Sequence, residues 1–194
     1  MIKPYFETHS IRYAWLVVGI AAGVIELSGA FRQREEATRR DRGSLVVLRI
    51  CTLPGVILLV FSPRILPAAE IRPPLVSAIV GLVVFSAGEA LRVWSKVTLG
   101  RYFTYTVMTS SDQPVITNGP YRFVRHPSYT GTLLIVVGIG ALWGNWLGLG
   151  ALTVLSAVGV AYRISVEEKA LLGELGDRYR TYAEHHKRLL PFVW

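Results

Sequence analysis

The chain has few of the residues from which disulfides, metal centres and phosphate-binding loops are made. Its only cysteine is Cys51, so no disulfide can form within the chain. The four histidines, His9, His126, His185 and His186, show no spacing typical of metal ligands, which argues against a zinc site. No GxGxxG motif follows a predicted strand, and no P-loop motif is present. The sequence therefore predicts no bound metal, and it contains neither of these nucleotide-binding motifs.

Acidic residues are in the minority. The 194 residues include 21 Lys and Arg against 13 Asp and Glu, which gives a net charge of +8. The basic residues lie in the short gaps between apolar runs and do not form the single stripe that a nucleic-acid-binding surface requires. Hydrophobic residues make up 52% of the chain, and the segment 131–161 has no ionisable side chain. These features predict an integral membrane protein with no nucleic-acid partner.

Apolar runs of about 17–25 residues are long enough to cross a bilayer as helices. Three runs meet this requirement, at residues 13–31, 44–61 and 73–94. A fourth run, 129–162, is long enough for two spans joined at Gly144 and Asn145, with Trp143 and Trp146 at the membrane interface. We expect an all-α integral membrane fold of five transmembrane helices. Residues 1–194 would form one domain, with the first three spans in 1–98 and a catalytic region containing spans 4 and 5 in 99–194.

The basic residues also orient the bundle by the positive-inside rule. Sixteen of them lie in three segments that would share one side of the membrane: Arg32, Arg34, Arg39, Arg40, Arg42, Arg92, Lys96, Arg101, Arg122, Arg125, Arg163, Lys169, Arg178, Arg180, Lys187 and Arg188. The opposite side would carry four: Lys3, Arg12, Arg64 and Arg72. This predicts an N-terminus outside and a cytoplasmic C-terminus. The segment before the fourth span and the C-terminal segment would both lie on the cytoplasmic side, so a polar site would be built mostly from these two. The basic cluster after the first run favours a retained span over a cleaved signal peptide.

Three ionisable residues fall within the predicted spans: Glu26, Arg49 and Glu89. Charged groups in lipid are costly, and they normally pair or face a polar cavity. We expect Arg49 to form an ion pair with one or both glutamates that holds three helices together. The alternative is that these residues form the floor of a polar pocket.

Residues 119–131 (GPYRFVRHPSYTG) form a polar, basic segment directly before an apolar run. Gly119 and Pro120 indicate a turn, and Pro127 favours the start of a helix. The backbone amides of residues 128–130 would then lie unpaired at a helix N-terminus, where they could bind a carboxylate or phosphate. The alternative is an interfacial anchor, in which lipid headgroups and the aromatic belt hold Arg122, Arg125, Tyr121 and Tyr129. Spacing alone favours neither interpretation.

The segment 163–171 continues the fifth span as a helix that leaves the membrane. Arg163 and Glu167 are four residues apart and share a face, whereas Glu168 is turned aside. An ion pair within the helix is one interpretation, and a bidentate Arg163 clamp for a substrate carboxylate is the other. Residues 178–186 (RYRTYAEHH) predict an amphipathic surface helix whose Tyr179 and Tyr182 cover the site or lie on the membrane.

These segments together resemble a family of membrane enzymes. The pattern is GxYxxxRHPxYxG over residues 119–131, RxxxEExxL over 163–171, YxxY over 179–182 and LPF at 190–192. Over about residues 85–194 it is similar to the isoprenylcysteine carboxyl methyltransferases, and in particular to a short prokaryotic member. Phospholipid N-methyltransferases share the pattern, and sterol reductases have a related one.

The resemblance implies a cytoplasmic cofactor pocket formed by the segment before the fourth span and the C-terminal segment. S-adenosyl-L-methionine would bind there, with S-adenosylhomocysteine as product. Matching positions imply ten cofactor contacts: Gln113, Pro114, Val115, Ile116, Tyr121, His126, Pro127, Ser128, Tyr129 and Glu168. Arg163 and Glu167 match positions assigned to substrate and catalysis. The chain departs from eukaryotic members at Met108 and Gln113, where those have Gln and His. It also has five predicted spans where those enzymes have eight.

The implied activity is formation of a methyl ester on the carboxylate of a prenylated cysteine or a similar hydrophobic thioether acid. Such a carboxylate, with a pKa of about 4, is ionised at neutral pH and needs no general base. Arg163 would orient it, and the lipid-tailed substrate, a small molecule or the prenylated C-terminus of a protein, would enter from the bilayer. Phospholipid or amine N-methylation, with Glu167 or Glu168 as base, is the nearest alternative. An NADPH-dependent reductase and a non-catalytic membrane scaffold are the others.

Overall fold

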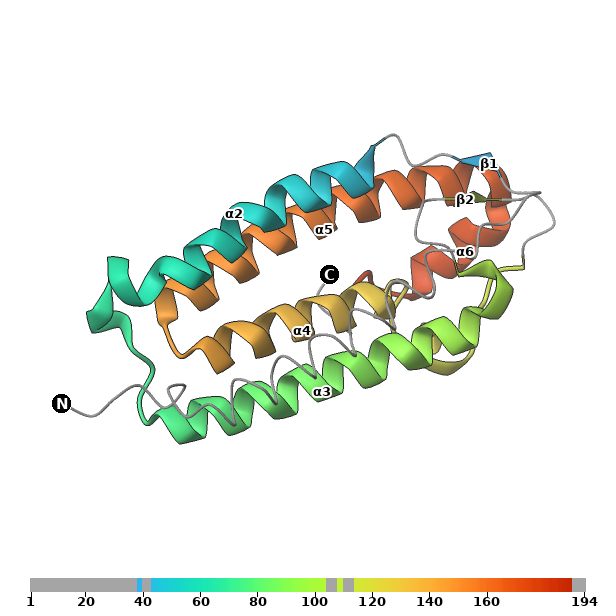
Figure 1. The fold of residues 1–194 in the computed structure, drawn as a ribbon. Coiled ribbons are helices and arrows are strands. Elements are labelled where there is room, and N and C mark those ends of the chain that lie inside the picture. The colour runs from blue at the N-terminus through green and yellow to red at the C-terminus, as the bar shows by residue number, and fades with distance from the viewer. Residues whose placement is uncertain (1–37, 40–42, 104–107, 110–113, 190–194) are drawn as a thin grey trace.

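The structure, a computed structural model, describes residues 38–39, 43–103, 108–109 and 114–189 (Figure 1). Its helices are α2 (Ser44–Ile65), α3 (Pro74–Leu99), α4 (Pro127–Trp143), α5 (Trp146–Leu175) and α6 (Asp177–His185). Three short 3-10 helices, η2 (Pro67–Ala69), η3 (Gly100–Tyr102) and η4 (Gly119–Arg122), lie between them. The strands β1 (Thr38–Arg39) and β2 (Met108–Thr109) pair antiparallel. Apart from this short ladder, the described part of the chain is helical, as the sequence predicts.

Three helical segments are long and apolar enough to cross a membrane: Ser44–Ile65, Pro74–Tyr102 and Trp146–Leu175. α4 is apolar but shorter, with 17 residues. The predicted runs 44–61, 73–94 and 129–162 are therefore confirmed as helices, and the three long ones indicate an integral membrane protein. The predicted first span, 13–31, lies outside the described residues, so the count of five transmembrane helices stays a prediction.

Gly144 and Asn145 form the turn between α4 and α5, as predicted. Gly144 has a φ of 74°, a left-handed conformation that glycine adopts without steric cost. Asn145 is buried; its Oδ1 accepts a hydrogen bond from the Leu147 N–H at 3.0 Å, and its Nδ2 donates to the Leu66 carbonyl at 3.0 Å. Asn145 therefore caps α5 and attaches this turn to the end of α2.

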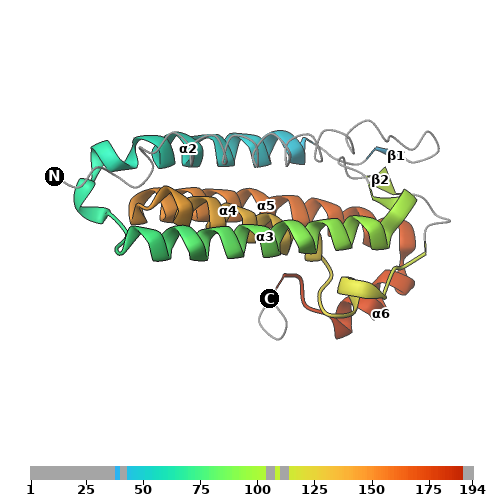
Figure 2. The same cartoon turned by 60° about the horizontal axis from the view of Figure 1, so that its bottom comes forward.

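The helices pack as two pairs, α3 along α4 and α2 along α5 (Figures 1 and 2). Glycines set the close approach of α3 to α4. A Cβ on Gly88 would lie 2.7 Å from the Gly131 carbonyl oxygen, and a Cβ on Gly138 would lie 2.8 Å from the Gly81 carbonyl oxygen. The two backbones therefore touch at these points, a packing that small residues permit between helices in lipid.

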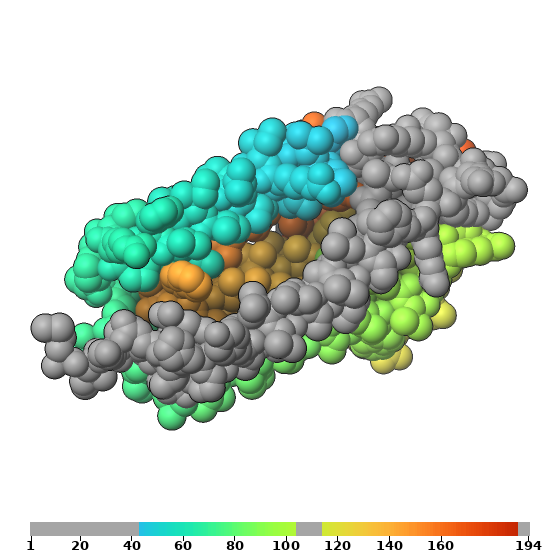
Figure 3. All heavy atoms as spheres, in the orientation of Figure 1, coloured from blue at the N-terminus to red at the C-terminus, as the bar shows by residue number. Residues whose placement is uncertain are grey.

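The outer faces of α2 and α3 are apolar and exposed. Ile50 and Val83, for example, keep 64% and 62% of their surface accessible. Figure 3 shows the outer surface of α2 as a continuous band along the molecule. Apolar surface of this extent on helices of membrane-spanning length is the surface that lipid chains cover.

Arg49 is also exposed on α2, and within residues 43–103 and 114–189 it makes no ion pair with Glu89. The physical reason is the helix pairing, because α2 packs on α5 whereas α3 packs on α4. An ion pair of Arg49 with both glutamates is therefore excluded, and the prediction now depends on Glu26. Glu26, the other predicted partner, lies outside the described residues.

Candidate active site

The segment before α4 folds as a turn followed by a short extended stretch. Gly119, with a φ of 55°, begins η4, as the Gly-Pro signal predicts. The backbone N–H groups of Arg125 and His126 then donate to the carbonyls of Lys187 and Arg188 at 2.8 and 2.9 Å. The C-terminal segment is therefore attached to the residues that enter α4.

Pro127 occupies the first turn of α4, also as predicted. The expectation of three unpaired amides behind it is wrong for two of them. The N–H groups of Tyr129 and Thr130 donate to the His126 carbonyl at 3.0 and 3.1 Å. The N-cap carbonyl of His126 begins the hydrogen-bond ladder of the helix, so of the three predicted donors only the Ser128 amide is left as a candidate for a ligand.

Glu168 is the centre of a buried group of ion pairs. Its Oε1 lies 3.0 Å from Nη2 of Arg125 and accepts a hydrogen bond from Nε2 of His126 at 3.2 Å. Its Oε2 accepts from Nε of Arg188 at 2.9 Å. Burial alone would raise the pKa of Glu168, but the hydrogen bonds from His126 and Arg188 and the charge of Arg125 prevail and lower it to about 2. Glu168, in the polar part of α5 beyond the apolar run, therefore stays ionised and joins three segments of the chain.

A second polar chain runs beside Glu168 and links Arg163 to Glu167 through Tyr129. Nε of Arg163 donates to the Tyr129 hydroxyl at 2.8 Å, and that hydroxyl donates to Oε2 of Glu167 at 2.7 Å. Nη1 of Arg163 donates to Oγ of Ser44 at 3.0 Å, which connects the chain to α2. Arg163 is buried, whereas the Glu167 side chain keeps 30% of its surface exposed, with Oε1 4.0 Å from Nδ1 of His126. Glu167 is thus the accessible carboxylate of the site.

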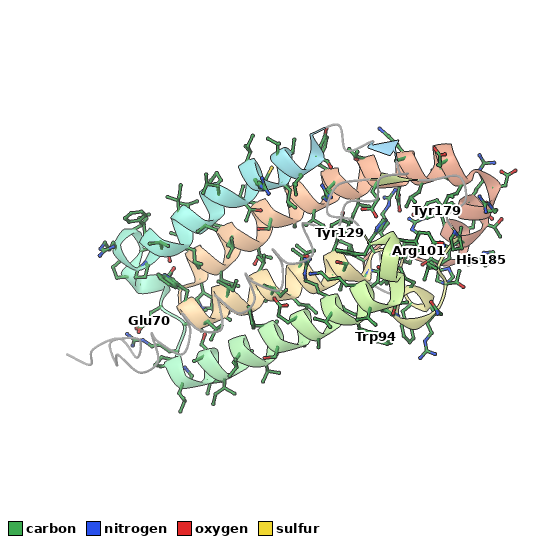
Figure 4. All side chains as sticks on the ribbon, turned by 45° about the vertical axis from the view of Figure 1, so that its right-hand side comes forward. Glu70, Trp94, Arg101, Tyr129, Tyr179 and His185 are labelled. Carbon is green, nitrogen blue, oxygen red and sulfur yellow. The ribbon has the colours of Figure 1, made fainter. Side chains whose placement is uncertain are left out.

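The C-terminal helix α6 lies at this end of the bundle. Figure 2 shows it set apart from the long helices, near the end of α3. Tyr179 and Tyr182 are both buried, which favours the interpretation that they cover the site over one in which they lie on the membrane. The Tyr182 hydroxyl donates to the Tyr121 carbonyl at 2.6 Å. Tyr179 packs with Leu175 and Tyr182. Figure 4 shows Tyr129 and Tyr179 at the same end of the bundle, far from Glu70.

The remaining predicted cofactor contacts are only partly brought to this cluster. Val115 packs against the Tyr179 cluster, Ile116 is half-buried, and Pro114 is exposed. Tyr121 is buried in η4, and Pro127 is buried at the start of α4. Gln113 lies outside the described residues.

The interfacial-anchor interpretation applies to one pair of side chains. Tyr121 is buried, Tyr129 is hydrogen-bonded within the site, and Arg125 pairs with Glu168, so none of these three serves as an anchor. Arg122 and Phe123 are exposed, with the guanidinium carbon 4.5 Å from the ring centroid. An Arg–Phe pair of this kind suits a lipid interface.

Sequence reasoning missed two residues of the site, Arg188 and Ser44. Arg188 enters the sequence argument only as one of the basic residues that orient the bundle, and Ser44 is a single polar residue at the start of an apolar run. Only their predicted positions on the same side of the membrane could have indicated them.

The described residues thus define a helical membrane protein with a buried polar site at one end of its bundle. The segment before α4, the polar end of α5 and α6 build this site. A cluster of convergent polar groups of this kind is a candidate binding or active site.

Comparisons with known proteins find similarity to one family. The sequence model of the isoprenylcysteine carboxyl methyltransferase (ICMT) family matches residues 79–173. A probable protein-S-isoprenylcysteine O-methyltransferase of Oryza sativa subsp. indica is 36% identical over 116 residues, which cover 59% of this chain and 61% of that protein. The protein-S-isoprenylcysteine O-methyltransferase of Tribolium castaneum is 34% identical over 116 residues, 59% of this chain and 41% of that protein. These matches confirm the resemblance seen in the sequence: residues 79–173 are similar to the isoprenylcysteine carboxyl methyltransferase family.

A solved structure agrees with this assignment. The eukaryotic intramembrane Ras methyltransferase ICMT superimposes with a TM-score of 0.62 and 31% identity, over 74% of this chain and 52% of that chain. The chain therefore spans about half of that structure, and 61% and 41% of the rice and beetle proteins. The family match includes His126, Arg163 and Glu168 but ends before α6.

Proposed function

We propose that this chain is an integral membrane methyltransferase that uses S-adenosyl-L-methionine to form a methyl ester on the carboxylate of a prenylated cysteine or a similar hydrophobic thioether acid. One observation carries the proposal. His126 and Glu168, from the two motif segments, are 42 residues apart in sequence and hydrogen-bonded at 3.2 Å. Both lie within the family-matched region and at the polar end of the bundle.

The residues at this end suit a polar cofactor. Among the side chains of residues 43–103 and 114–189, Nε of Arg125 and the hydroxyl of Tyr179 are buried hydrogen-bonding groups without a partner. Such groups are costly unless something satisfies them. Glu167 adds a partly exposed carboxylate, whose Oε1 lies 4.0 Å from Nδ1 of His126. S-adenosyl-L-methionine would supply an electrophilic methyl group, and Tyr121, His126, Ser128, Tyr129 and residues 113–116 are the proposed contacts that hold it.

Arg163 is proposed to orient the substrate carboxylate. Its guanidinium has five N–H donors in a fixed plane, and Tyr129 and Ser44 fix that plane from two sides. A buried, oriented guanidinium can bind a carboxylate in a bidentate manner in surroundings of low dielectric. Positioning of this kind can supply several kcal/mol of the barrier reduction, about 7–11 kcal/mol in the best intramolecular cases.

Glu167 and Glu168 have different proposed roles. Glu167, with one oxygen bound by Tyr129, would accept N–H donors or balance positive charge beside the reacting groups. Both oxygens of Glu168 are engaged by protein side chains, so we infer that it acts by positioning His126 and Arg125. The five-span topology, the cytoplasmic face for this site and entry of the lipid-tailed substrate from the bilayer are parts of the same proposal.

Amine or phospholipid N-methylation is the second candidate, and the exposure of Glu167 favours it. An amine must be neutral to accept a methyl group, and an accessible carboxylate is a suitable base for the ammonium proton. The structural relative and the two curated relatives are named for carboxyl or isoprenylcysteine O-methylation, which places this candidate second.

A ligand-binding experiment tests the cofactor. The detergent-purified chain should gain thermal stability with S-adenosylhomocysteine and not with NADPH. At a hundredfold excess over its Kd, the ligand should add about 2.7 kcal/mol to the free energy of unfolding. Stabilisation by NADPH alone would instead support a reductase, and no response to either ligand would support a scaffold.

A further inference from the structure

Two tyrosines of α6, three residues apart, differ in how their hydroxyl groups are satisfied. Tyr182 donates to the Tyr121 carbonyl at 2.6 Å, which attaches α6 to η4. Tyr179 is 4% exposed, and its hydroxyl has no hydrogen-bond partner among the described residues. A buried hydroxyl without a partner costs about 1–3 kcal/mol, so its retention calls for an explanation.

The surroundings of Tyr179 are apolar on one side and charged on the other. Leu175 and Tyr182 are buried with it, whereas Val115, Leu171 and Ala183 pack against the cluster and keep part of their surface accessible. Burial raises the pKa of the Tyr179 hydroxyl, and the negative charges of Glu168 and Glu167 raise it further. The hydroxyl is therefore a neutral group that can both donate and accept a hydrogen bond.

This combination fits a nucleobase better than the amino-acid end of the same ligand. A nucleobase offers flat apolar faces together with ring acceptors and an exocyclic donor, which suit an open apolar wall with one neutral polar group. The amino-acid end carries two charges and needs charged partners, whereas the residues that pack in the Tyr179 cluster are uncharged. Val115 also belongs to the segment 113–116, which the family resemblance assigns to the cofactor.

We propose that the Tyr179 hydroxyl forms a hydrogen bond to the adenine of the methyl donor, against an apolar wall that includes Val115 and Leu171. This assignment rests on the proposed function, because it names a contact to the cofactor of that reaction. It gives α6, which lies outside the family-matched region, a part in cofactor binding.

Two tyrosine variants and two ligands test the proposal. Tyr179→Phe and Tyr182→Phe each remove one hydroxyl from the same helix. S-adenosylhomocysteine has the adenosine and the amino-acid end, whereas 5′-methylthioadenosine keeps the adenosine alone. Isothermal titration would give the Kd of each ligand, and thermal unfolding without ligand would give the stability of each variant.

The proposal predicts opposite behaviour of the two variants. Tyr179→Phe should keep or raise the unfolding temperature without ligand and should weaken both ligands by the same factor, about five- to tenfold for one neutral hydrogen bond. Tyr182→Phe should lower the unfolding temperature without ligand because it removes the bond to Tyr121.

Three results would overturn the assignment. Unchanged Kd values in Tyr179→Phe would show that the hydroxyl does not contact the cofactor. A loss confined to S-adenosylhomocysteine would place the hydroxyl at the amino-acid end. Failure of the unmodified chain to bind either ligand would remove the proposed function and this contact together, whereas the first two results leave the proposed function standing.

Discussion

The two ends of the helix bundle both carry ion pairs, but they use them differently. At the end formed by η2 and the α4–α5 turn, Glu70 pairs with Arg72 at 3.0 Å, with side chains 43% and 80% exposed. At the other end, the Glu168 side chain is 9% exposed and is bound by Arg125, His126 and Arg188. The first pair is local and solvated, whereas the second joins segments far apart in the sequence and removes a carboxylate from water. The difference indicates that the polar end has a function that the end formed by η2 and the α4–α5 turn, called the loop end below, does not share.

The largest expected effect is on stability at the polar end. Glu168→Ala leaves the buried His126 and the largely buried Arg125 without their carboxylate and should lower the free energy of unfolding by about 3–5 kcal/mol. Glu70→Ala, the matched change at the loop end, should cost about 0–1 kcal/mol. Thermal or denaturant unfolding in detergent would measure both. Equal losses in the two variants would remove the contrast between the ends.

The next effect is on activity. Arg163→Ala should lower methyl transfer about 100-fold, or about 2.7 kcal/mol of transition-state stabilisation, because the carboxylate loses its orienting guanidinium. Arg72→Ala at the loop end should keep full activity. Binding of S-adenosylhomocysteine serves as the folding control and should persist in Arg163→Ala. Full activity in that variant would show that the orienting role is wrong.

A smaller effect concerns the bundle between the two ends. Gly88→Ala places a methyl group 2.7 Å from the Gly131 carbonyl oxygen, so α3 and α4 must separate, at a cost of about 1–3 kcal/mol. Gly150→Ala, on α5, meets nothing within 4 Å and should be neutral or slightly stabilising. Unfolding midpoints of the two variants compare directly. Similar values would contradict the close glycine packing.

The smallest effect is a dependence of stability on pH. The pKa of Glu168 falls from its ordinary value of 4.5 to about 2 in the folded chain. A carboxylate with a lowered pKa stabilises the fold above the unfolded pKa, and that contribution fades as the pH falls toward the folded pKa. Between about pH 6 and pH 4 the unmodified chain should lose about 1 kcal/mol from this group, and Glu168→Gln should not show that loss. Parallel pH profiles of the two proteins would mean that Glu168 is not the group responsible.

The sequence predicts where the helices lie along the chain better than it predicts which helices pack together. The lengths of the apolar runs after the first predict the observed helices. The Gly144–Asn145 turn follows because the run 129–162 is long enough for two helices. Which helix packs on which could not be predicted, because every span presents similar apolar surface to lipid. The glycines at positions 81, 88, 131 and 138 decide the α3–α4 contact, and their meaning is visible only once the backbones are seen to touch. For the same reason the sequence could not show that Arg49 and Glu89 lie on different helix pairs.

For the site, the sequence predicts which segments meet but not which atoms bind. The basic-residue orientation and the family pattern bring residues 119–131 and 163–171 to one side of the membrane, and the bond from His126 to Glu168 joins them. The sequence could not show that the Tyr129 hydroxyl links Arg163 to Glu167. It also gave no indication of Arg188, whose role depends on the return of the C-terminal segment to His126.

The most direct test of the central claim is the chemical nature of the methylated product. The purified chain is incubated with S-adenosyl-L-methionine labelled in its methyl group and with N-acetyl-S-farnesylcysteine, and the product is then treated with alkali. A methyl ester releases its label as methanol, whereas an N-methyl group resists hydrolysis. We expect label that alkali releases, formed by the unmodified chain and about 100-fold less by Arg163→Ala. Label carried only by an alkali-stable product of an added amine lipid would contradict the proposal.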